Sequence, residues 1–220
     1  MKIRNLLAVV MLVVSVCAQA QKTPAWQDPV LNQINRLQDR ANFFAYESEA
    51  LANKDQNPKY NVKAQSSRFM SLDGTWKFHW VESANLRPTD FYKVNYDDSN
   101  WGTMPVPGMW ELNGYGDAIY VNNHYAWRSD WIGEPPTVQD KGNYVGSYRK
   151  SFSIPASWKG EKVYLHVGSA TSNIQVYVNG KFVGYSEDSK VAAEFDVTKF
   201  LTPGKDNLIA FAPLLNHFGK

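Results

Sequence analysis

Cysteine is almost absent from this 220-residue chain, which contains one, Cys17. A single cysteine cannot form an intramolecular disulfide, so a disulfide-stapled fold is excluded. Long apolar runs are also missing: the unbroken apolar stretch 6–14 has nine residues, whereas a membrane span needs about 20. Net charge is low, with 23 basic and 21 acidic residues, so charge gives no support for a nucleic-acid or anionic-membrane partner.

Several catalytic signatures are lacking as well. The sequence has no GxxxxGK, GxGxxG or GxSxG motif, which are the signatures of phosphate-binding loops, dinucleotide sites and serine hydrolases. Its four histidines are scattered without metal-ligand spacing, so we expect packed or half-exposed histidines and no metal site.

Glu187 and Asp188 form an adjacent acid pair that could suggest glycoside chemistry. Neighbouring residues on a strand point to opposite faces, whereas a retaining glycosidase needs two carboxyl groups about 5 Å apart across one sugar. We therefore expect these residues to be turn carboxylates that accept hydrogen bonds from backbone amides.

Residues 1–20 have the pattern of a secretory signal peptide. Basic residues precede the apolar run, and Ala18-Gln19-Ala20 supplies small residues for cleavage before the next residue. The alternative is a lipoprotein signal that is modified at Cys17, although bulky Val16 stands where a small residue is favoured. We expect export to a bacterial periplasm and no membrane contact after cleavage.

The next segment, 21–70, is expected to be a lead-in and a connector. Apolar residues at positions 31, 34, 37 and 41 have helix-like spacing, which predicts an irregular or short helical lead-in. The polar stretch 47–65 predicts a surface connector.

From residue 71 onward, short alternating segments predict an all-β fold. Asn179-Gly180 joins two such segments, and this pair is a strong hairpin signal because both turn residues need positive φ. The expected strands are 76–81, 147–154, 162–167, 173–178, 181–185, 193–196 and 207–211. Several short strands at this spacing predict a jelly-roll β-sandwich over 71–211.

Residues 101–131 are rich in glycine, proline, asparagine and aromatic residues, and we expect long ordered loops there. Aromatic rings stack on the apolar faces of sugars, while amides hydrogen-bond sugar hydroxyls. The alternative is that the tryptophans and tyrosines fill the core. The residues with this sugar-binding chemistry are Trp110, Tyr120, Asn122, Asn123, Tyr125 and Trp127.

Several longer motifs give more specific information about the family of the chain. They are WQDP at 26–29, QINRL at 33–37, SLDGTWKF at 71–78, PVPGMWELNGY at 105–115, IYVN at 119–122, VNGKFVGYSEDSK at 178–190 and EFD at 194–196. In order and spacing they resemble the amino-terminal part of long-chain bacterial β-galactosidases of glycoside hydrolase family 2. The resemblance covers about 26–211 and implies a sugar-binding domain with a galactose-binding-domain-like jelly roll.

The family hydrolyses terminal β-D-galactosides with retention, through two glutamates on a barrel that follows this domain. The resemblance therefore implies no catalytic residue in this chain, which we expect to be inactive alone. In the family, the asparagine that ends the IYVN-type stretch touches the sugar, and Asn122 matches it. Tyr120, Asn123 and Trp127 are weaker substrate-binding candidates.

The resemblance stops after residue 211. In the family an Arg-Trp-Ser-Asp-Gly stretch follows, whose aspartate contacts sugar and ligates sodium, but here 212–220 reads APLLNHFGK. We expect an out-of-family tail there, with Pro213 breaking the strand unless the strand lies on an edge. Full-length relatives use Mg²⁺ and Na⁺, with ligands mostly outside this region, so no cofactor or metal is expected in this chain.

Three functions remain open at this point. The chain can be the sugar-binding part of a β-galactosidase, a free-standing carbohydrate-binding module, or a non-functional fragment that complements a partner. The expected partners are a galactoside or related sugar and either further copies of the chain or a barrel-containing chain.

Overall fold

The computed structural model describes residues 23–41, 43–54, 66–116, 138, 141–188 and 190–215. Within these residues the regular structure is mostly β-strand. The strands are β1 Gln33–Ile34, β2 Gly74–Ser83, β3 Gly102–Val106, β4 Lys141–Ser153, β5 Tyr164–Val167, β6 Asn173–Val178, β7 Lys181–Ser186, β8 Ala193–Asp196 and β9 Asp206–Leu215. The helical elements are η1 Ala25–Gln27, α2 Glu49–Lys54, η2 Ala84–Leu86, η3 Glu111–Asn113, η4 Ala156–Trp158 and η5 Thr198–Phe200.

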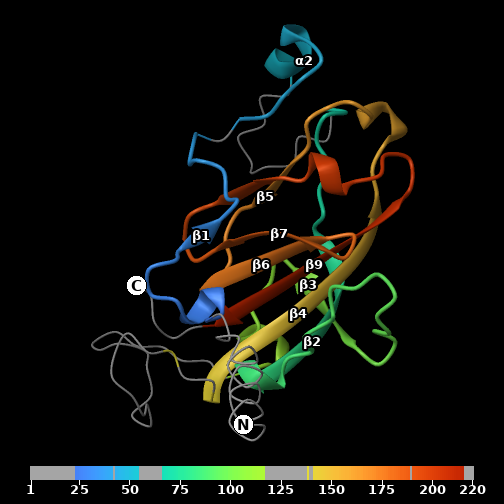
Figure 1. Ribbon diagram of the computed structural model, residues 1–220. Coiled ribbons are helices and arrows are strands. Elements are labelled where there is room, and N and C mark those ends of the chain that lie inside the picture. Colours follow the sequence, from blue (N-terminus) through green and yellow to red (C-terminus); the bar gives the residue numbers. More distant parts are fainter. Residues whose placement is uncertain are drawn as a thin grey trace, which may run out of the picture.

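The strands form two antiparallel sheets. Seven strands lie in the order β1-β7-β6-β9-β4-β2-β3, and β5 pairs with β8 in the second sheet. The chain passes from β4 to the small sheet, back for the β6–β7 hairpin, to β8, and then returns as β9 between β6 and β4. Figure 1 shows the long strands side by side, with β5 on the other side of β7. The predicted all-β sandwich is confirmed.

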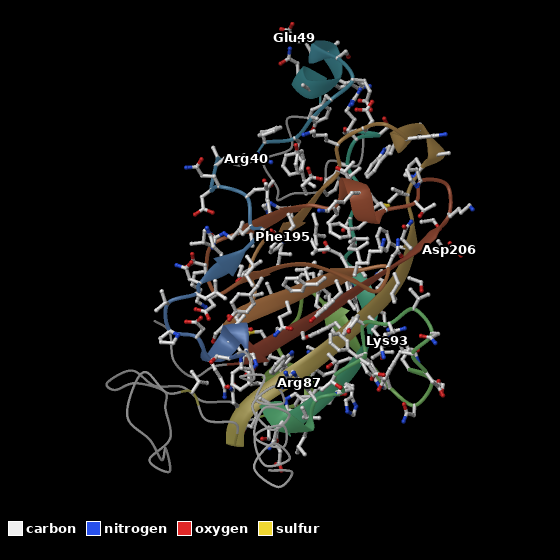
Figure 2. The ribbon with its side chains drawn as sticks, in the orientation of Figure 1. Arg40, Glu49, Arg87, Lys93, Phe195 and Asp206 are labelled. Carbon is white, nitrogen blue, oxygen red and sulfur yellow. The ribbon has the colours of Figure 1, made fainter. Side chains whose placement is uncertain are left out.

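The main core lies between the two sheets. Ile174, Val176 and Val178 alternate along β6 and share one buried cluster with Phe195 of β8. Phe195 is completely buried, and Figure 2 places it among the sheets in the middle of the molecule. Each such side chain contributes about 1.5–3 kcal/mol when it is buried, so this layer holds the small sheet on the large one.

The β6–β7 connection has the conformation that its residues predict. Asn179 has φ +50° and Gly180 has φ +77°, which are the positive values that a two-residue hairpin needs. The predicted Asn-Gly hairpin is therefore confirmed.

The opposite face of the large sheet is covered by chain rather than by a third sheet. Phe91 and Trp101, from the segment between β2 and β3, pack with Ala210 and Ala212 of β9. Further along this face, Trp26 of η1 is buried in a cluster with Val145 and Tyr185. The lead-in segment thus belongs to the folded body.

For the lead-in we expected an irregular or short helical segment, and the irregular alternative is the one found, because no helix occurs over 31–41. Gln33–Ile34 form β1, which pairs antiparallel with β7, and the backbone N–H of Leu37 donates to the carbonyl of Glu194 in β8 at 2.8 Å. Extended backbone in this segment forms hydrogen bonds with the open edges of both sheets. Such tertiary contacts override the helical preference that a local apolar spacing indicates.

Two other boundaries differ from expectation. Residues 102–106, which we expected to be loop, form β3 beside β2. The expected break at Pro213 is wrong, because β9 continues to Leu215 between β6 and β4. Pro213 pairs with Ile174 of β6, whereas the pairing with β4 skips positions 212 and 213. Proline has no N–H, so one ladder is interrupted while the other holds the strand.

One α-helix occurs among the described residues, in the polar stretch expected to be a connector. The six-residue α2 has no buried residue, and Figure 1 shows it at the top, away from the sheets. Among the described residues, no helix is both long and apolar enough to cross a membrane.

Candidate functional site

The predicted sugar-binding residues Asn122, Tyr120, Asn123 and Trp127 lie outside the described residues, as do Tyr125 and the rest of 117–137. The structure describes the two flanks of this segment, which are 102–116 and β4. These flanks form the base from which the candidate site is built.

Trp110 anchors the first flank in the core. It is 8 % exposed, and its Nε1–H donates to the Tyr148 hydroxyl of β4 at 2.5 Å. The ring lies against Gly146, where an added Cβ would come within 2.6 Å of Trp110 and Phe78. Trp110 therefore serves as a buried anchor, as in the alternative that tryptophans fill the core.

The end of this flank also rests on aromatic rings. Tyr115 packs edge to face on Phe78 with ring centres 4.8 Å apart, and Trp80 packs on Tyr144 at 5.1 Å. Gly116 has φ +71°, and a Cβ there would lie 3.3 Å from the Tyr144 ring. The chain therefore enters 117–137 from a fixed position.

Electrostatics at this base favour neutral groups. Burial raises the pKa of Tyr148 to about 12, and the hydrogen bond from Trp110 opposes the rise only in part. Tyr148 thus stays protonated at neutral pH. With its raised pKa the Tyr148 hydroxyl is a weaker acid than an exposed tyrosine, and its hydrogen bond with Trp110 serves to position the two segments of chain that carry these residues.

Above this base, two apolar side chains face solvent. Met109 is 62 % exposed and Leu112 is 82 % exposed, although both belong to a segment whose Trp110 is buried. Asn113 fixes this turn by donating from Nδ2 to the carbonyl of Met109 at 2.8 Å.

A cavity of about 340 Å³ lies on the outer face of the large sheet, beside Arg149. The Arg149 side chain is 5 % exposed, its Nε donates to Asp98 Oδ2 at 2.6 Å, and its Nη1 donates to the carbonyls of Phe91 and Lys93. These bonds hold the segment 91–98 on the sheet. The guanidinium is occupied by the protein itself, so its role is structural.

A second cavity, of about 400 Å³, lies between the lead-in segment and the small sheet. Glu194 forms an ion pair there with Arg40 at 2.8 Å, and its Oε1 lies within hydrogen-bond distance of His166 Nδ1 at 3.0 Å. Figure 2 shows Arg40 on the lead-in segment at the side of the molecule. Among the described residues, no group of three or more His, Cys, Asp or Glu side chains could hold a metal ion.

The remaining candidate residues, a histidine and the adjacent acid pair, contact other side chains. His79 stacks on Trp101 with ring centres 5.4 Å apart. Glu187 accepts a hydrogen bond from the Tyr185 hydroxyl at 2.5 Å, and Asp188 accepts one from Arg36 at 3.0 Å. We expected backbone amides as the partners of this acid pair, whereas these bonds come from side chains. His124 and His217 lie outside the described residues.

Sequence reasoning missed the contacts between distant segments. Asp98 and Arg149 are 51 positions apart, and no local motif links an aspartate in a turn to an arginine on a strand. The turn around Asp98 and the alternating pattern of β4 can be recognised in the sequence. The contact between Asp98 and Arg149, however, depends on the order of the strands in the sheet.

The comparisons with known proteins agree on one family. Residues 69–216 match the family model described as "Glycosyl hydrolases family 2, sugar binding domain". The chain is 35 % identical to a β-galactosidase of Priestia megaterium over 194 residues, which are 87 % of this chain and 18 % of that protein. It is 40 % identical to a β-galactosidase of Streptococcus thermophilus over 142 residues, which are 64 % of this chain and 14 % of that protein.

Solved structures give weaker likenesses. A family 2 glycosyl hydrolase from Bacteroides cellulosilyticus has a TM-score of 0.47 at 25 % identity, over 68 % of this chain and 18 % of that one. A β-glucuronidase of Bacteroides uniformis has a TM-score of 0.46 at 23 % identity, over 65 % of this chain and 14 % of that one. The chain spans less than a fifth of the length of the β-galactosidases of Priestia megaterium and Streptococcus thermophilus. Its match to the family model places this chain in glycosyl hydrolase family 2, as a sugar-binding domain.

Proposed function

We propose that this chain is the amino-terminal sugar-binding domain of a β-galactosidase and that it recognises terminal β-D-galactosides. The observation that carries the proposal is the 35 % identity, over 87 % of the chain, to a protein named β-galactosidase. Hydrolysis is proposed for a longer protein of which this domain forms part.

Within this domain, Asn122 is the proposed sugar contact, supported by Tyr120, Asn123 and Trp127. Amides can hydrogen-bond hydroxyls while aromatic rings cover the apolar sugar face. Calorimetry with galactose tests this. We expect weak binding that Asn122→Ala reduces at least about tenfold, which corresponds to about 1.4 kcal/mol. The exposed Asn100→Ala is the matched control and should leave the affinity unchanged.

The 220-residue chain alone is expected to have no hydrolytic activity, because the resemblance assigns both catalytic glutamates to a barrel outside these motifs. Mg²⁺ and Na⁺ are likewise proposed to act in the longer protein rather than in this domain. A chromogenic o-nitrophenyl β-D-galactoside is the test. Turnover by the purified chain that survives removal of any host β-galactosidase contradicts the proposal.

Two further outcomes separate the alternatives. Sub-millimolar galactose binding that depends on Asn122 favours a free-standing carbohydrate-binding module. No heat at high sugar concentration contradicts sugar recognition by the isolated chain and favours a complementing fragment. Activity that appears only on mixing with a barrel-containing chain would identify that partner, and sedimentation would detect homo-oligomers.

We also propose export to the periplasm through cleavage after Ala20. The mass of the mature protein from an expressing bacterium tests this, because cleavage leaves Gln21 as the first residue. Lipidation at Cys17 is the alternative, and a Cys17→Ser variant that releases the protein from membranes would favour it.

A further inference from the structure

Three aromatic side chains and one valine form a partly exposed surface at the β6–β7 hairpin, called the aromatic patch, whose members are Tyr92, Val94, Tyr177 and Phe182. Tyr92 and Tyr177 stack with ring centres 4.4 Å apart and planes 9° apart. Phe182 meets Tyr177 edge to face at 5.5 Å. Phe182 remains 39 % exposed and Val94 remains 64 % exposed, so the patch presents apolar surface to solvent.

The patch joins two parts of the chain. Tyr177 lies on β6 and pairs across the hairpin with Phe182 of β7, whereas Tyr92 and Val94 come from the segment between β2 and β3. A Cβ built on Gly180 would lie 3.7 Å from the Val94 side chain, which places this segment against the hairpin tip.

The aromatic rings of the patch are held from below. The Tyr177 hydroxyl donates to Gln175 Oε1 at 2.9 Å, and Phe91 packs edge to face on the Tyr177 ring at 5.7 Å. Arg149 holds the segment that carries Tyr92 through the carbonyls of Phe91 and Lys93. An aromatic surface that is rigid before binding loses little conformational entropy when it binds.

Polar groups border the rings. Burial raises the pKa of Tyr177; Tyr92 adds to the rise and Arg87 opposes it. The side-chain amide of Gln175 lies at the Tyr177 hydroxyl, from which its Oε1 accepts a hydrogen bond at 2.9 Å. The patch thus combines a small apolar surface with a hydroxyl and an amide group at one border.

We propose that the aromatic patch binds a pyranose ring of a neutral oligosaccharide by stacking, with hydrogen bonds from its polar border. A pyranose has an apolar C–H face and a rim of hydroxyls, and this pairing matches the patch. A stable protein partner needs about 20–30 residues on each side, far more than these four side chains supply. The proposal goes beyond the galactoside contact at Asn122, because stacking uses none of the residues proposed there.

Affinity electrophoresis tests the proposal with soluble β-1,4-galactan cast into a native gel, and with laminarin and dextran in parallel gels. We expect galactan to retard the chain. Phe182→Ala and Tyr92→Ala should weaken the retardation about threefold to tenfold, since an aromatic contact contributes about 0.5–1.5 kcal/mol. Tyr164→Ala is the matched control, because Tyr164 is a 45 % exposed aromatic residue on the small sheet, and it should behave as the unsubstituted chain.

Phe182→Ala decides the question if Tyr92→Ala fails to fold, because the Phe182 side chain is the more exposed of the two. Unchanged retardation in a folded Phe182→Ala chain, or no retardation in any of the three gels, overturns the proposal. A dimer in sedimentation that Phe182→Ala converts to monomer also overturns it, since the patch is then a self-association surface. Galactose calorimetry on Asn122→Ala is a separate measurement, so either proposal can fail without the other.

Discussion

The side-chain amides of Asn179 and Asn207 are hydrogen-bonded to each other, with Asn179 Nδ2 2.8 Å from Asn207 Oδ1. Asn179 Oδ1 also accepts from the backbone N–H of Leu208 at 2.8 Å, and Asn207 Nδ2 donates to the carbonyl of Thr202 at 3.1 Å. This pair ties the hairpin tip to the turn before β9. Asn179, which adopts the positive φ of the hairpin turn, therefore also connects that turn to the turn before β9.

Asn179→Ala should lower the free energy of unfolding by about 2–4 kcal/mol, because it removes several half-buried hydrogen bonds and places alanine at positive φ. Asn179→Gly keeps the backbone conformation and should cost less. Urea unfolding followed by tryptophan fluorescence measures both, and Asn100→Ala is the exposed control. Equal losses for the alanine and glycine variants would show that the conformation of residue 179 contributes nothing.

Arg149→Met should lower stability by about 3–5 kcal/mol, because it leaves Asp98 and several carbonyls without their buried partner. Arg149→Lys should not restore stability, since lysine lacks the planar fork that reaches these acceptors. Thermal unfolding gives the comparison. Arg68→Met is the matched control, because Arg68 and Glu161 form an exposed ion pair at 3.7 Å, which should contribute less than about 1 kcal/mol.

Gly184→Ala should displace the lead-in segment. A Cβ at this position would lie 2.6 Å from the carbonyl oxygen of Ile34 and from the Phe195 ring, and neither can move freely. We expect a loss of about 1–3 kcal/mol and faster protease cleavage near β1. Gly168→Ala is the control, since no atom of the described residues lies within 4 Å of the place its methyl group would take. Equal cleavage rates in the two variants would contradict the close contact.

Stability should fall between about pH 10 and pH 12. Burial raises the pKa of Tyr148 to about 12, above the value near 10 of an exposed tyrosine. The unfolded chain therefore releases this proton first as the pH rises, and alkali favours unfolding. Urea unfolding from pH 8 to pH 11.5 measures the slope. Tyr148→Phe should make the slope shallower without abolishing it, because burial also raises the pKa of Tyr177 and Tyr185. The exposed Tyr164→Phe should leave the slope unchanged.

The sequence predicted the elements that depend on local pattern. Alternation in 173–178 and the Asn179-Gly180 turn indicated β6 and its hairpin, because one buried face and two positive φ values are local requirements. The lead-in could not be predicted this way. Its apolar spacing fits a helix, but the open edges of β7 and β8 offer hydrogen bonds that only the folded sheets provide.

Pro213 shows the same limit from the other direction. A proline argues against an interior strand, because it has no N–H to donate. β9 is nevertheless an interior strand, because its pairing with β6 continues at Pro213 while the pairing with β4 is interrupted there. For the site, the sugar-binding residues predicted around Asn122 lie outside the described residues and stay a prediction, whereas the role of Trp110 as a buried anchor depends on Gly146 in a distant strand.

The pairing of β1 with β7 also has a consequence for solubility. A long, flat sheet edge with unpaired N–H groups recruits strands from other molecules and leads to aggregation. Among the described strands, the edges of the large sheet are β1, which has two residues, and β3, whose Pro105 has no N–H to offer. Without residues 33–34 the six-residue β7 would become the edge. The lead-in segment thus protects the domain against edge-to-edge polymerisation.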